Sequence, residues 1–346
     1  MSVTDTSPIV RDALIEAFLA RCGWAGTARD KLPGDASFRR YERLTLEGRR
    51  AMLMDAPPPK EDVRPFLRVA RHLTSLGFSA PHVFEADEAS GLLLLEDLGD
   101  DTFTRLLAKG ADEPALYELA VDTLIALHHV PVDKVLPLHT PPYDEAKLLE
   151  EARLLTDWFM PAISGSPLPA DVTESYAAAW CDAFKALESQ PYTLVLRDYH
   201  VDNLMRLPSR SGVSACGLLD FQDALVGPTA YDLVSLLEDA RRDLAPGLAE
   251  AMTARYLAAF PKLNAEAFAA AAAVLAAQRN AKIVGIFTRL SRRDGKHHYL
   301  GHVPRVWRLL ENDLRHPALA SVRAWFDRHV PRELRRAPDA PASVSP

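Results

Sequence analysis

The 346-residue chain is long enough to form two units that each bury their own core. Its apolar fraction of 48% and charged fraction of 25% are ordinary for a globular protein, and no apolar run approaches the roughly 20 residues of a membrane-spanning helix. The N-terminus is polar and acidic, unlike a secretory signal, so we expect a soluble, cytoplasmic protein that does not associate with membranes. The scattered Cys22, Cys181 and Cys216 suggest neither a disulfide framework nor a zinc site.

The net charge of −7 argues against nucleic acid as a partner, because phosphate backbones favour a basic face. The charge is also uneven along the chain: residues 1–230 carry −13 and residues 231–346 carry +6. Local potential can select the charge of a ligand. The basic C-terminal third therefore favours an anionic ligand over a polycationic one.

The first 98 residues predict a small antiparallel sheet with a helix on it. Glu47-Gly48 and residues 87–91 have the composition of hairpin turns between strands. The pattern places helices at 8–22 and 62–76, and strands at 38–46, 50–54, 83–86 and 92–96.

From Thr102 onward the pattern is mainly helical, and the alanine-rich 265–277 predicts a closely packed helix. Three short strands are expected within this part, at 193–197, 204–207 and 216–221. The Pro/Ala/Ser-rich residues 337–346 are expected to be disordered. The whole chain is thus expected to be α+β, with an N-terminal unit over 1–98, a C-terminal unit over 99–336 and a tail.

Three oxygen-bearing side chains follow two of these strands. Asp198 and Asn203 stand five positions apart just after the first strand, and Asp220 follows the third strand. Phosphoryl transfer needs an Asp to orient the attacking hydroxyl, together with Asn and Asp oxygens as ligands of Mg²⁺. A D-x-x-x-x-N spacing alone arises by chance about once in a chain of this length. The flanking strands and the third residue make the joint pattern much rarer.

At these residues the chain resembles the protein-kinase-like superfamily, especially its aminoglycoside/choline kinase branch. The resemblance implies a bilobal fold, an antiparallel-sheet N-lobe that binds ATP, and a mainly helical C-lobe that binds the acceptor. It implies Asp198 as the catalytic residue, Asn203 and Asp220 as Mg²⁺ ligands, and Asp223 as an auxiliary carboxylate. Leu196-Arg197 departs from the His-Arg or His-Gly found there in the superfamily.

The resemblance also implies a phosphate-covering loop at residues 32–41, although the segment is not a G-x-G-x-x-G. An ordinary hairpin turn is the alternative. The strand at 50–55 has no lysine, whereas the superfamily carries one there to hold the α- and β-phosphates. Arg39 and Arg40 are the candidate replacements, or else they are solvated strand residues. The nucleotide-binding candidates in the loop are Ser37, Phe38, Arg39 and Arg40.

Residues 92–100 resemble the hinge between the two lobes. Backbone groups around Glu96 and Leu98 would there hydrogen-bond the nucleobase.

On the acceptor side, a helix starting near Tyr143-Asp144 carries Glu151 and Asp157 beside an apolar stripe. These carboxylates either bind sugar hydroxyls or form an exposed helical face. Arg241-Arg242 either joins a structural salt-bridge cluster or meets an anionic acceptor. The acceptor-binding candidates are His200, Asp202, Gln222, Asp223, Glu151, Asp157 and Arg242.

Within this branch, the runs LRDYHVDNLM and GLLDFQDALVGPTAYDLVSLLEDARRD resemble the subfamily of anomeric amino-sugar kinases of cell-wall recycling. That resemblance implies ATP-dependent phosphorylation of the C1 hydroxyl of N-acetylmuramate and/or N-acetylglucosamine. Two alternatives stay open: a kinase for another small alcohol, such as choline, homoserine or an aminoglycoside, and a nucleotide-binding pseudokinase module. A protein kinase is disfavoured because Asp220 leads to Gly227-Pro228 without room for an activation loop. The oligomeric state is not predicted.

Overall fold

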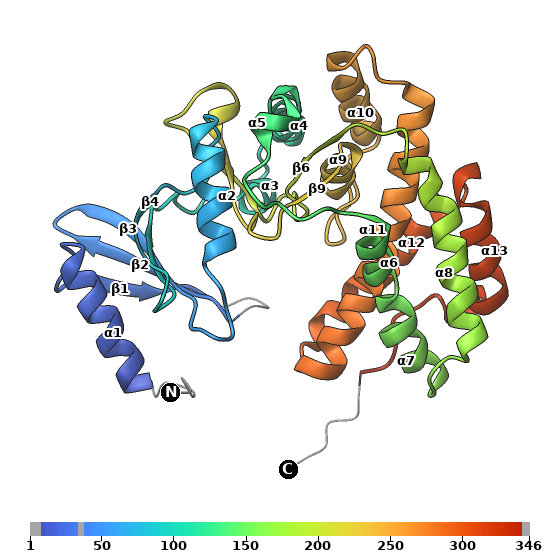
Figure 1. Ribbon diagram of the computed structural model, residues 1–346, viewed down its shortest axis with the longest axis horizontal. Coiled ribbons are helices and arrows are strands. Elements are labelled where there is room, and N and C mark those ends of the chain that lie inside the picture. The colour runs from blue at the N-terminus through green and yellow to red at the C-terminus, as the bar shows by residue number, and fades with distance from the viewer. Residues whose placement is uncertain (1–7, 34–37, 341–346) are drawn as a thin grey trace. The chain divides into compact units, whose positions relative to one another are not determined.

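The computed structural model describes residues 8–33 and 38–340, which divide by their contacts into two units (Figure 1). Unit 1 contains the chain up to Asp112 together with Val201–Ala224, and unit 2 contains Glu113–His200 and the chain from Leu225 onward. Unit 1 holds an antiparallel sheet and unit 2 is mostly helical, which confirms the predicted α+β class. The lobe boundaries at residues 98 and 336 stay predictions.

Unit 1 is built on a five-stranded antiparallel sheet in the order β1-β2-β3-β5-β4, with a separate two-stranded β7–β8 sheet. Its elements are α1 (Pro8–Arg21), β1 (Ala28–Lys31), β2 (Arg40–Leu46), β3 (Arg49–Asp55), α2 (Arg64–Ser75), β4 (Val83–Asp87), β5 (Leu92–Leu95), α3 (Phe103–Ala108), β7 (Leu204–Arg206) and β8 (Cys216–Leu218).

The alternation of side chains along the strands gives the sheet two apolar faces. Leu92 and Leu94 of β5 pack with Phe18 and Leu19 of α1 in one buried cluster. Leu93, which the pleat turns the other way, is also buried, and α2 lies on that side of the sheet (Figure 1). Both faces of the central strands are therefore covered by helices.

The hairpin between β2 and β3 turns where the sequence predicts. Glu47 and Gly48 have φ values of 52° and 78°, and two positive values in succession suit a two-residue hairpin whose twist matches its strands. Strand β1 was not predicted, because Ala28-Arg29-Asp30-Lys31 is short, polar and mostly exposed at the sheet edge. An edge strand of this kind carries almost no hydrophobic pattern to find.

Unit 2 packs its helices around α11, with β6 and β9 forming a two-stranded antiparallel sheet. Its elements are α4 (Glu113–His129), α5 (Val132–Val135), α6 (Glu145–Ala152), the π-helical segment η1 (Leu155–Phe159), α7 (Met160–Ser164), α8 (Ala170–Phe184), β6 (Tyr192–Val195), β9 (Leu225–Pro228), α9 (Ala230–Leu237), α10 (Leu248–Ala259), α11 (Ala265–Asp294), α12 (Val303–Asp313) and α13 (Ala320–His329).

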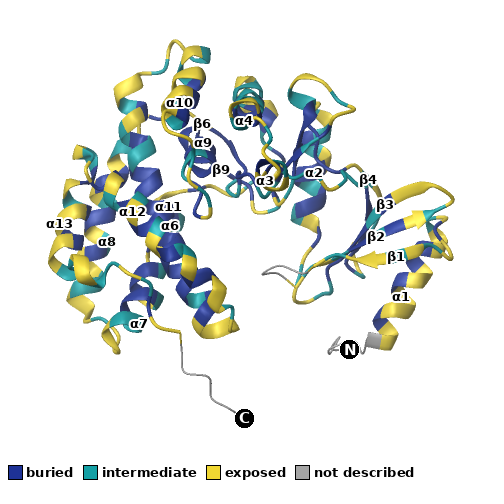
Figure 2. Ribbon diagram, turned by 180° about the vertical axis from the view of Figure 1, so that it is seen from behind, coloured by how far each residue is buried: buried dark blue, intermediate teal, exposed yellow. Residues whose placement is uncertain are grey.

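Helix α11 is the centre of unit 2 and is dark blue over much of its length in Figure 2. It extends the helix predicted at 265–277 to 30 residues. A Cβ added at Gly285 would lie 2.2 Å from the carbonyl carbon of Leu154, so only glycine lets α11 approach the backbone just before η1. No helix among the described residues is long and apolar enough to cross a bilayer.

Two carboxylates, the buried Asp313 and the half-buried Glu238, lie close together where α9, α11 and α12 meet. Asn280 Nδ2 donates to Glu238 Oε2 at 2.8 Å and to Asp313 Oδ2 at 2.9 Å. Burial, reinforced by the neighbouring Glu238, raises the pKa of Asp313 well above its usual range, and burial likewise raises the pKa of Glu238. Because the folded pair holds a proton that the unfolded chain releases above about pH 4, its contribution to stability falls as pH rises.

Replacing Asp313 by asparagine should therefore raise the midpoint of thermal unfolding at pH 8 by a few degrees, and by less at pH 5. The substitution removes one buried negative charge while an amide can still face Glu238. Calorimetry at both pH values measures the effect, with Asp327→Asn on the exposed surface of α13 as the control. A lower midpoint at pH 8 would show that the charged pair stabilises the fold.

Candidate active site

Asn203 and Asp220 are brought together in unit 1 by the β7–β8 ladder. Leu204 pairs with Leu218, and one step further the Leu219 amide donates to the Asn203 carbonyl at 2.9 Å. Asn203 comes just before β7, and Asp220 comes just after the end of β8. The antiparallel pairing of β7 and β8 therefore places the two residues at the same end of the ladder. This is the convergence that the sequence predicts for two Mg²⁺ ligands.

Asp220 lies among polar side chains from three segments of unit 1. Its φ of 55° is in the left-handed region, which Asp and Asn tolerate better than most residues. Gln222 Nε2 donates to Asp220 Oδ1 at 2.8 Å, and Arg39 Nη2 lies 3.5 Å from the same oxygen. Arg39 Nε is also 3.7 Å from Glu61. The Asp220 carboxylate therefore faces a guanidinium that could share a phosphate with a bound cation.

The two arginines proposed to replace the missing lysine occupy different surroundings. Burial lowers the pKa of Arg39, but nearby negative groups including Asp220 and Asp223 outweigh it, so the pKa is raised and the guanidinium stays charged. Arg40 instead contacts Asp55 at 2.5 Å, and Arg11 binds the same carboxylate. Of the two, only Arg39 is seen beside Asp220. Residues 34–37, which include the predicted Ser37, lie outside the described residues, and the neighbouring Phe38 is exposed.

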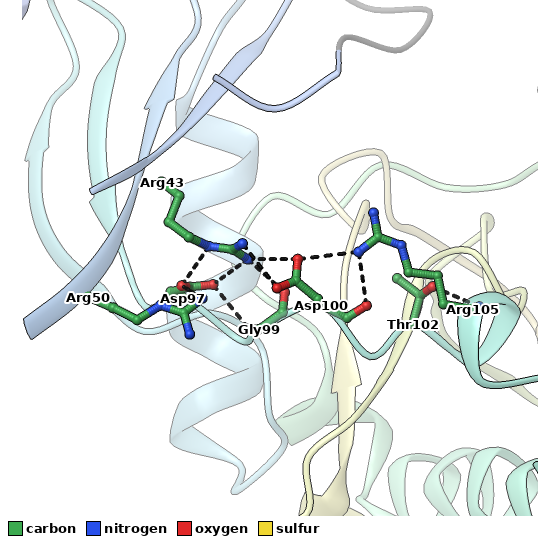
Figure 3. Close-up of polar contacts among 7 residues, drawn as sticks. All are labelled: Arg43, Arg50, Asp97, Gly99, Asp100, Thr102 and Arg105. Carbon is green, nitrogen blue, oxygen red and sulfur yellow. Dashed lines mark hydrogen bonds and ion pairs between the residues drawn. The ribbon is translucent and has the colours of Figure 1, made fainter. Parts of the chain in front are cut away.

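The predicted hinge is fixed to the sheet by an ion network (Figure 3). The Asp97 carboxylate is buried and accepts from Arg43 of β2 at 2.9 Å, and Arg50 of β3 approaches it at 2.7 Å. Arg43 also contacts Asp100 at 3.0 Å and the Gly99 carbonyl at 3.1 Å. Two arginines from adjacent strands thus hold residues 97–100 in one conformation.

The predicted hinge also contacts neighbouring segments of unit 1. The Glu96 amide donates to the His82 carbonyl at 2.8 Å, and the Glu96 side chain pairs with Arg210. A Cβ added at Gly217 would lie 3.2 Å from Leu98 Cδ1, so the Leu98 side chain packs directly on β8. Gly217 is three residues before Asp220 in the sequence. Hinge and metal-ligand candidates therefore belong to one packed assembly in unit 1.

Asp198 lies in the loop that follows β6 in unit 2. Asp232 of α9 hydrogen-bonds the backbone of this loop. Asp232 Oδ2 accepts from the Leu196 amide at 2.6 Å and Oδ1 accepts from the Arg197 amide at 2.8 Å. Arg197 has a φ of 72°, and its carbonyl accepts from Ser235 at 3.1 Å. Burial raises the pKa of Asp232 to about 7 although the two amides lower it. Asp232 thus braces the backbone where the superfamily's histidine is replaced by Leu196.

Cationic groups surround the Asp198 carboxylate within unit 2. Burial raises the pKa of Asp198. Its neighbours Lys282, His200, Arg197 and Arg279 together lower that pKa by more. The pKa of Asp198 therefore lies below its usual value, and the residue is a carboxylate at neutral pH. A carboxylate that stays ionised can accept a proton from, or orient, a hydroxyl.

Glu151, predicted as an acceptor contact, lies at the centre of a buried ion cluster. Lys282 Nζ lies 3.0 Å from Glu151 Oε2, and Arg197 and the Tyr143 hydroxyl also bind this carboxylate. Burial raises the pKa of Glu151, but the two cations and the Tyr143 hydrogen bond outweigh it and leave the pKa below its ordinary range. Glu151 therefore holds the cations that neighbour Asp198, and its contact with an acceptor stays a prediction.

The other acceptor candidates are distributed over both units. In unit 1, Asp202 accepts from the Thr104 hydroxyl, while Gln222 and Asp223 lie with Asp220 and Arg39 as described above. In unit 2, His200 is buried beside Asp198, and Asp157 is exposed on η1. Arg242 pairs with Glu113 at 2.5 Å, and its contact with an acceptor stays a prediction.

Two residues that contact or neighbour the loop carrying Asp198 were missed by sequence reasoning. Asp232 and Lys282 lie in segments whose patterns predict ordinary amphipathic helices, and neither belongs to the D-x-x-x-x-N motif. A carboxylate in the first turn of a helix that follows Gly227-Pro228 was the available signal for Asp232. The sequence held no comparable signal for Lys282, because only tertiary packing brings α11 to the loop after β6.

Residues 8–33 and 38–340 contain no group of three or more His, Cys, Asp or Glu side chains that could hold a metal ion. The donors at the end of β7–β8 are one amide and one carboxylate. This set suits Mg²⁺, which is commonly bound by few protein oxygens and completed by phosphates and water.

Sequence relatives cover most of the chain. An N-acetylmuramate/N-acetylglucosamine kinase of Caulobacter vibrioides is 39% identical, over 94% of this chain and 98% of its own length. The protein of the same description from Pseudomonas aeruginosa is 41% identical, over 89% of this chain and 91% of its own length.

Solved structures share the fold at low sequence identity. A choline/ethanolamine kinase family protein from Mesorhizobium loti has a TM-score of 0.62 and 16% identity, covering 91% of this chain and 99% of that one. The GDP complex of aminoglycoside 2'-phosphotransferase-IIIa has a TM-score of 0.59 and 15% identity, covering 88% of this chain and 98% of that one. The family model described as "Phosphotransferase enzyme family" matches residues 30–265. Since that model spans well over half of the sequence, the chain belongs to the phosphotransferase enzyme family and is a small-molecule kinase.

Proposed function

We propose that this protein transfers the γ-phosphoryl group of ATP to the anomeric C1 hydroxyl of N-acetylmuramate and/or N-acetylglucosamine, as a cytoplasmic step of cell-wall recycling. The observation that carries the proposal is the identity of 39% and 41% to two kinases described by these sugars, over about nine-tenths of each chain. Identity at that level and coverage usually preserves the substrate class as well as the fold.

The nucleotide is assigned to unit 1. Because the Glu96 amide is already bonded to His82, the nucleobase would be contacted by the Glu96 carbonyl and the Leu98 amide. Asn203 and Asp220 would hold Mg²⁺, which when bound neutralises charge on the phosphates. Arg39, beside Asp220, would take the place of the absent lysine on β3.

The acceptor hydroxyl is assigned to Asp198, whose ionised carboxylate would orient it and receive its proton. Lys282, Arg279 and Arg197 place positive charge near Asp198, of which Glu151, paired with Lys282 and Arg197, offsets a part. That charge favours an anionic acceptor such as N-acetylmuramate and disfavours choline or a polycationic aminoglycoside. Acceptor contacts are proposed for His200, Asp202, Gln222, Asp223, Asp157, Glu151 and Arg242.

NMR of the products made from each sugar with Mg-ATP tests the proposal directly. Phosphorylation at C1 gives phosphorus coupling to the anomeric proton, which identifies both the acceptor and the carbon. The matched reaction with Asp198→Asn controls for contaminating kinases. Phosphate on another carbon, or turnover only with choline, homoserine or an aminoglycoside, would refute it.

The assignment of Arg39 has its own test. Arg39→Ala should raise the KM for ATP about 10- to 100-fold, because hydrogen bonds to charged groups contribute roughly 1.5–3 kcal/mol. Arg40→Ala is the matched control, since Arg40 pairs with Asp55, and its KM for ATP should change less than the Arg39 variant's. Steady-state kinetics at saturating sugar measures both. Equal effects of the two substitutions would remove the distinction.

A further inference from the structure

Helix α11 of unit 2 carries an arginine whose charge has no partner. Arg289 is half-buried, and its guanidinium forms no hydrogen bond or ion pair within the part of the chain that the structure describes. Its Nε is buried, whereas its two terminal nitrogens are not among the buried atoms. Burial and the neighbouring Arg293 lower the pKa of Arg289, and the opposing effect of Asp294 is smaller. The fold thus keeps a positive charge where water solvates it poorly.

Neighbouring basic groups on α11 are compensated by carboxylates. Lys282 Nζ lies 3.0 Å from Glu151, and Arg293 Nε lies 2.7 Å from Asp294. Removing a charge from water costs free energy unless an opposite charge or hydrogen bonds meet it. Departures from this rule are expected at functional sites, where stability is given up for binding. An anionic ligand would supply the partner that Arg289 lacks.

Arg289 lies on the face of α11 that leads to Asp198. Residues at intervals of three and four share one face of a helix, and on α11 this face carries Arg279, Lys282, Ile286 and Arg289. The first two are buried, the next two are half-buried, and the last residues of α11 are exposed (Figure 2). At the buried end, Arg279 and Lys282 both lower the pKa of Asp198. The stripe therefore runs outward from the carboxylate assigned to the acceptor hydroxyl and reaches Arg289.

The length of this stripe suits one acidic sugar. The helix rises about 10 Å between Lys282 and Arg289, which is comparable with the length of a substituted sugar ring. Side chains on a helix generally lean toward its N-terminus, the end at which Lys282 lies. A sugar whose anomeric hydroxyl meets Asp198 would rest its ring on Ile286 and present a substituent from the far side of the ring to Arg289. N-acetylmuramate has a lactyl carboxylate on C3, where N-acetylglucosamine has only a hydroxyl.

We propose that Arg289 binds the carboxylate of the acceptor and thereby makes the kinase favour N-acetylmuramate over N-acetylglucosamine. The proposal rests on the sugar-kinase activity proposed above and adds a specificity-determining residue to it. A guanidinium suits this task because two parallel N–H groups can meet the two oxygens of a carboxylate. Glu151 already binds Lys282 and Arg197, so these two cations are less available to the sugar.

Steady-state kinetics of Arg289→Gln with both sugars, at saturating Mg-ATP, tests the proposal. We expect the KM for N-acetylmuramate to rise about 10- to 100-fold, the effect of losing hydrogen bonds between charged groups. The KM for N-acetylglucosamine should change less than about twofold, and kcat should stay near the parent's for both sugars. Because the two sugars differ in the lactyl group, the ratio of their kcat/KM values isolates the contact with the carboxylate. Arg289→Lys keeps the charge without the paired donors and should give an intermediate ratio.

Arg292→Gln is the matched control. It removes the same charge three residues further along α11, from an exposed arginine that donates to the Asp339 carbonyl at 2.9 Å, and should keep the parent's ratio. The methyl ester of N-acetylmuramate is a second probe that needs no change in the protein. The parent should have a KM for the ester about 10- to 100-fold above that for the acid, whereas Arg289→Gln should not distinguish the two.

Equal changes in KM for the two sugars, or an unchanged KM for N-acetylmuramate in Arg289→Gln, would overturn the proposal. A parent enzyme that accepts the ester as readily as the acid would also overturn it, even if the variant were to unfold. Thermal unfolding detects such a loss, although removing an unpaired charge should not lower the midpoint. If the parent phosphorylates neither sugar, the proposed function fails and this proposal fails with it. Turnover of both sugars with an unchanged ratio in the variant refutes the role of Arg289 alone.

Discussion

Replacing Asp198 by asparagine is expected to lower kcat by about 10²-fold or more while leaving the affinity for nucleotide nearly unchanged. The carboxylate belongs to unit 2, where burial and cationic neighbours surround it, and the nucleotide contacts are assigned to unit 1. Asparagine has almost the same shape but cannot take up the proton of the acceptor hydroxyl. The loss should therefore fall on turnover and spare the KM for ATP.

Asp144→Asn provides the matched control for this experiment. Asp144 is also in unit 2, and it caps α6 by accepting from the Lys147 amide at 2.9 Å, a role that asparagine fills equally well. Coupled-enzyme kinetics on the sugar should give parental turnover for this control. If Asp198→Asn also kept full kcat, Asp198 would not be the residue that handles the acceptor proton.

The metal-ligand candidates could be read from the sequence because they lie next to the strands that position them. Asn203 and Asp220 flank β7 and β8, which were expected as strands at 204–207 and 216–221, and the antiparallel pairing seen in the structure brings them together. The β2–β3 hairpin was predictable for the same reason, since Glu47-Gly48 specifies its turn locally. Local chemistry and short-range pairing therefore account for these parts of the prediction.

What the sequence could not supply depends on contacts between distant segments. Lys282 influences Asp198 only because α11, with Gly285 against the Leu154 backbone, packs through the centre of unit 2. The strand β9 was missed because its four residues, Leu225–Pro228, include a glycine and a proline, which lower strand propensity. Arg39 and Arg40 are adjacent and alike in sequence, and only the fold shows that they meet different carboxylates.

The bracing of the catalytic loop illustrates how one missing residue is replaced. Leu196 stands where the superfamily has histidine, and a buried leucine cannot hydrogen-bond the backbone. Asp232 instead accepts from the amides of Leu196 and Arg197, one on each oxygen. Two bonds to one carboxylate fix both the strand end and the turn at Arg197, whose φ is positive. The conformation that presents Asp198 thus has its support from α9.

Replacing Asp220 by asparagine should remove most of the Mg²⁺-dependent binding of nucleotide, while Asp198→Asn retains it. Loss of a partner of a metal ligand typically costs 10- to 100-fold in metal affinity, and loss of charge on a ligand itself should cost at least as much. Asparagine is preferable to alanine here because the φ of 55° at Asp220 would strain alanine. The side chain keeps an oxygen for Gln222, whose Nε2 donates to it at 2.8 Å.

Calorimetric titration of ATP into the parent and the variant, with and without Mg²⁺, separates this effect from misfolding. The parent should bind far more tightly with Mg²⁺, and the Asp220 variant should bind about equally weakly in both conditions. Asp62→Asn, at an exposed carboxylate of the same unit that pairs with Arg64 at 2.8 Å, should keep the Mg²⁺ dependence of the parent. Because Arg39 lies 3.5 Å from Asp220, the guanidinium could still hold phosphate after the charge is lost, which is why residual binding without Mg²⁺ is expected. An unchanged Mg²⁺ dependence in the Asp220 variant would mean that the cation is held elsewhere, and the assignment of Asn203 as its second ligand would fail too.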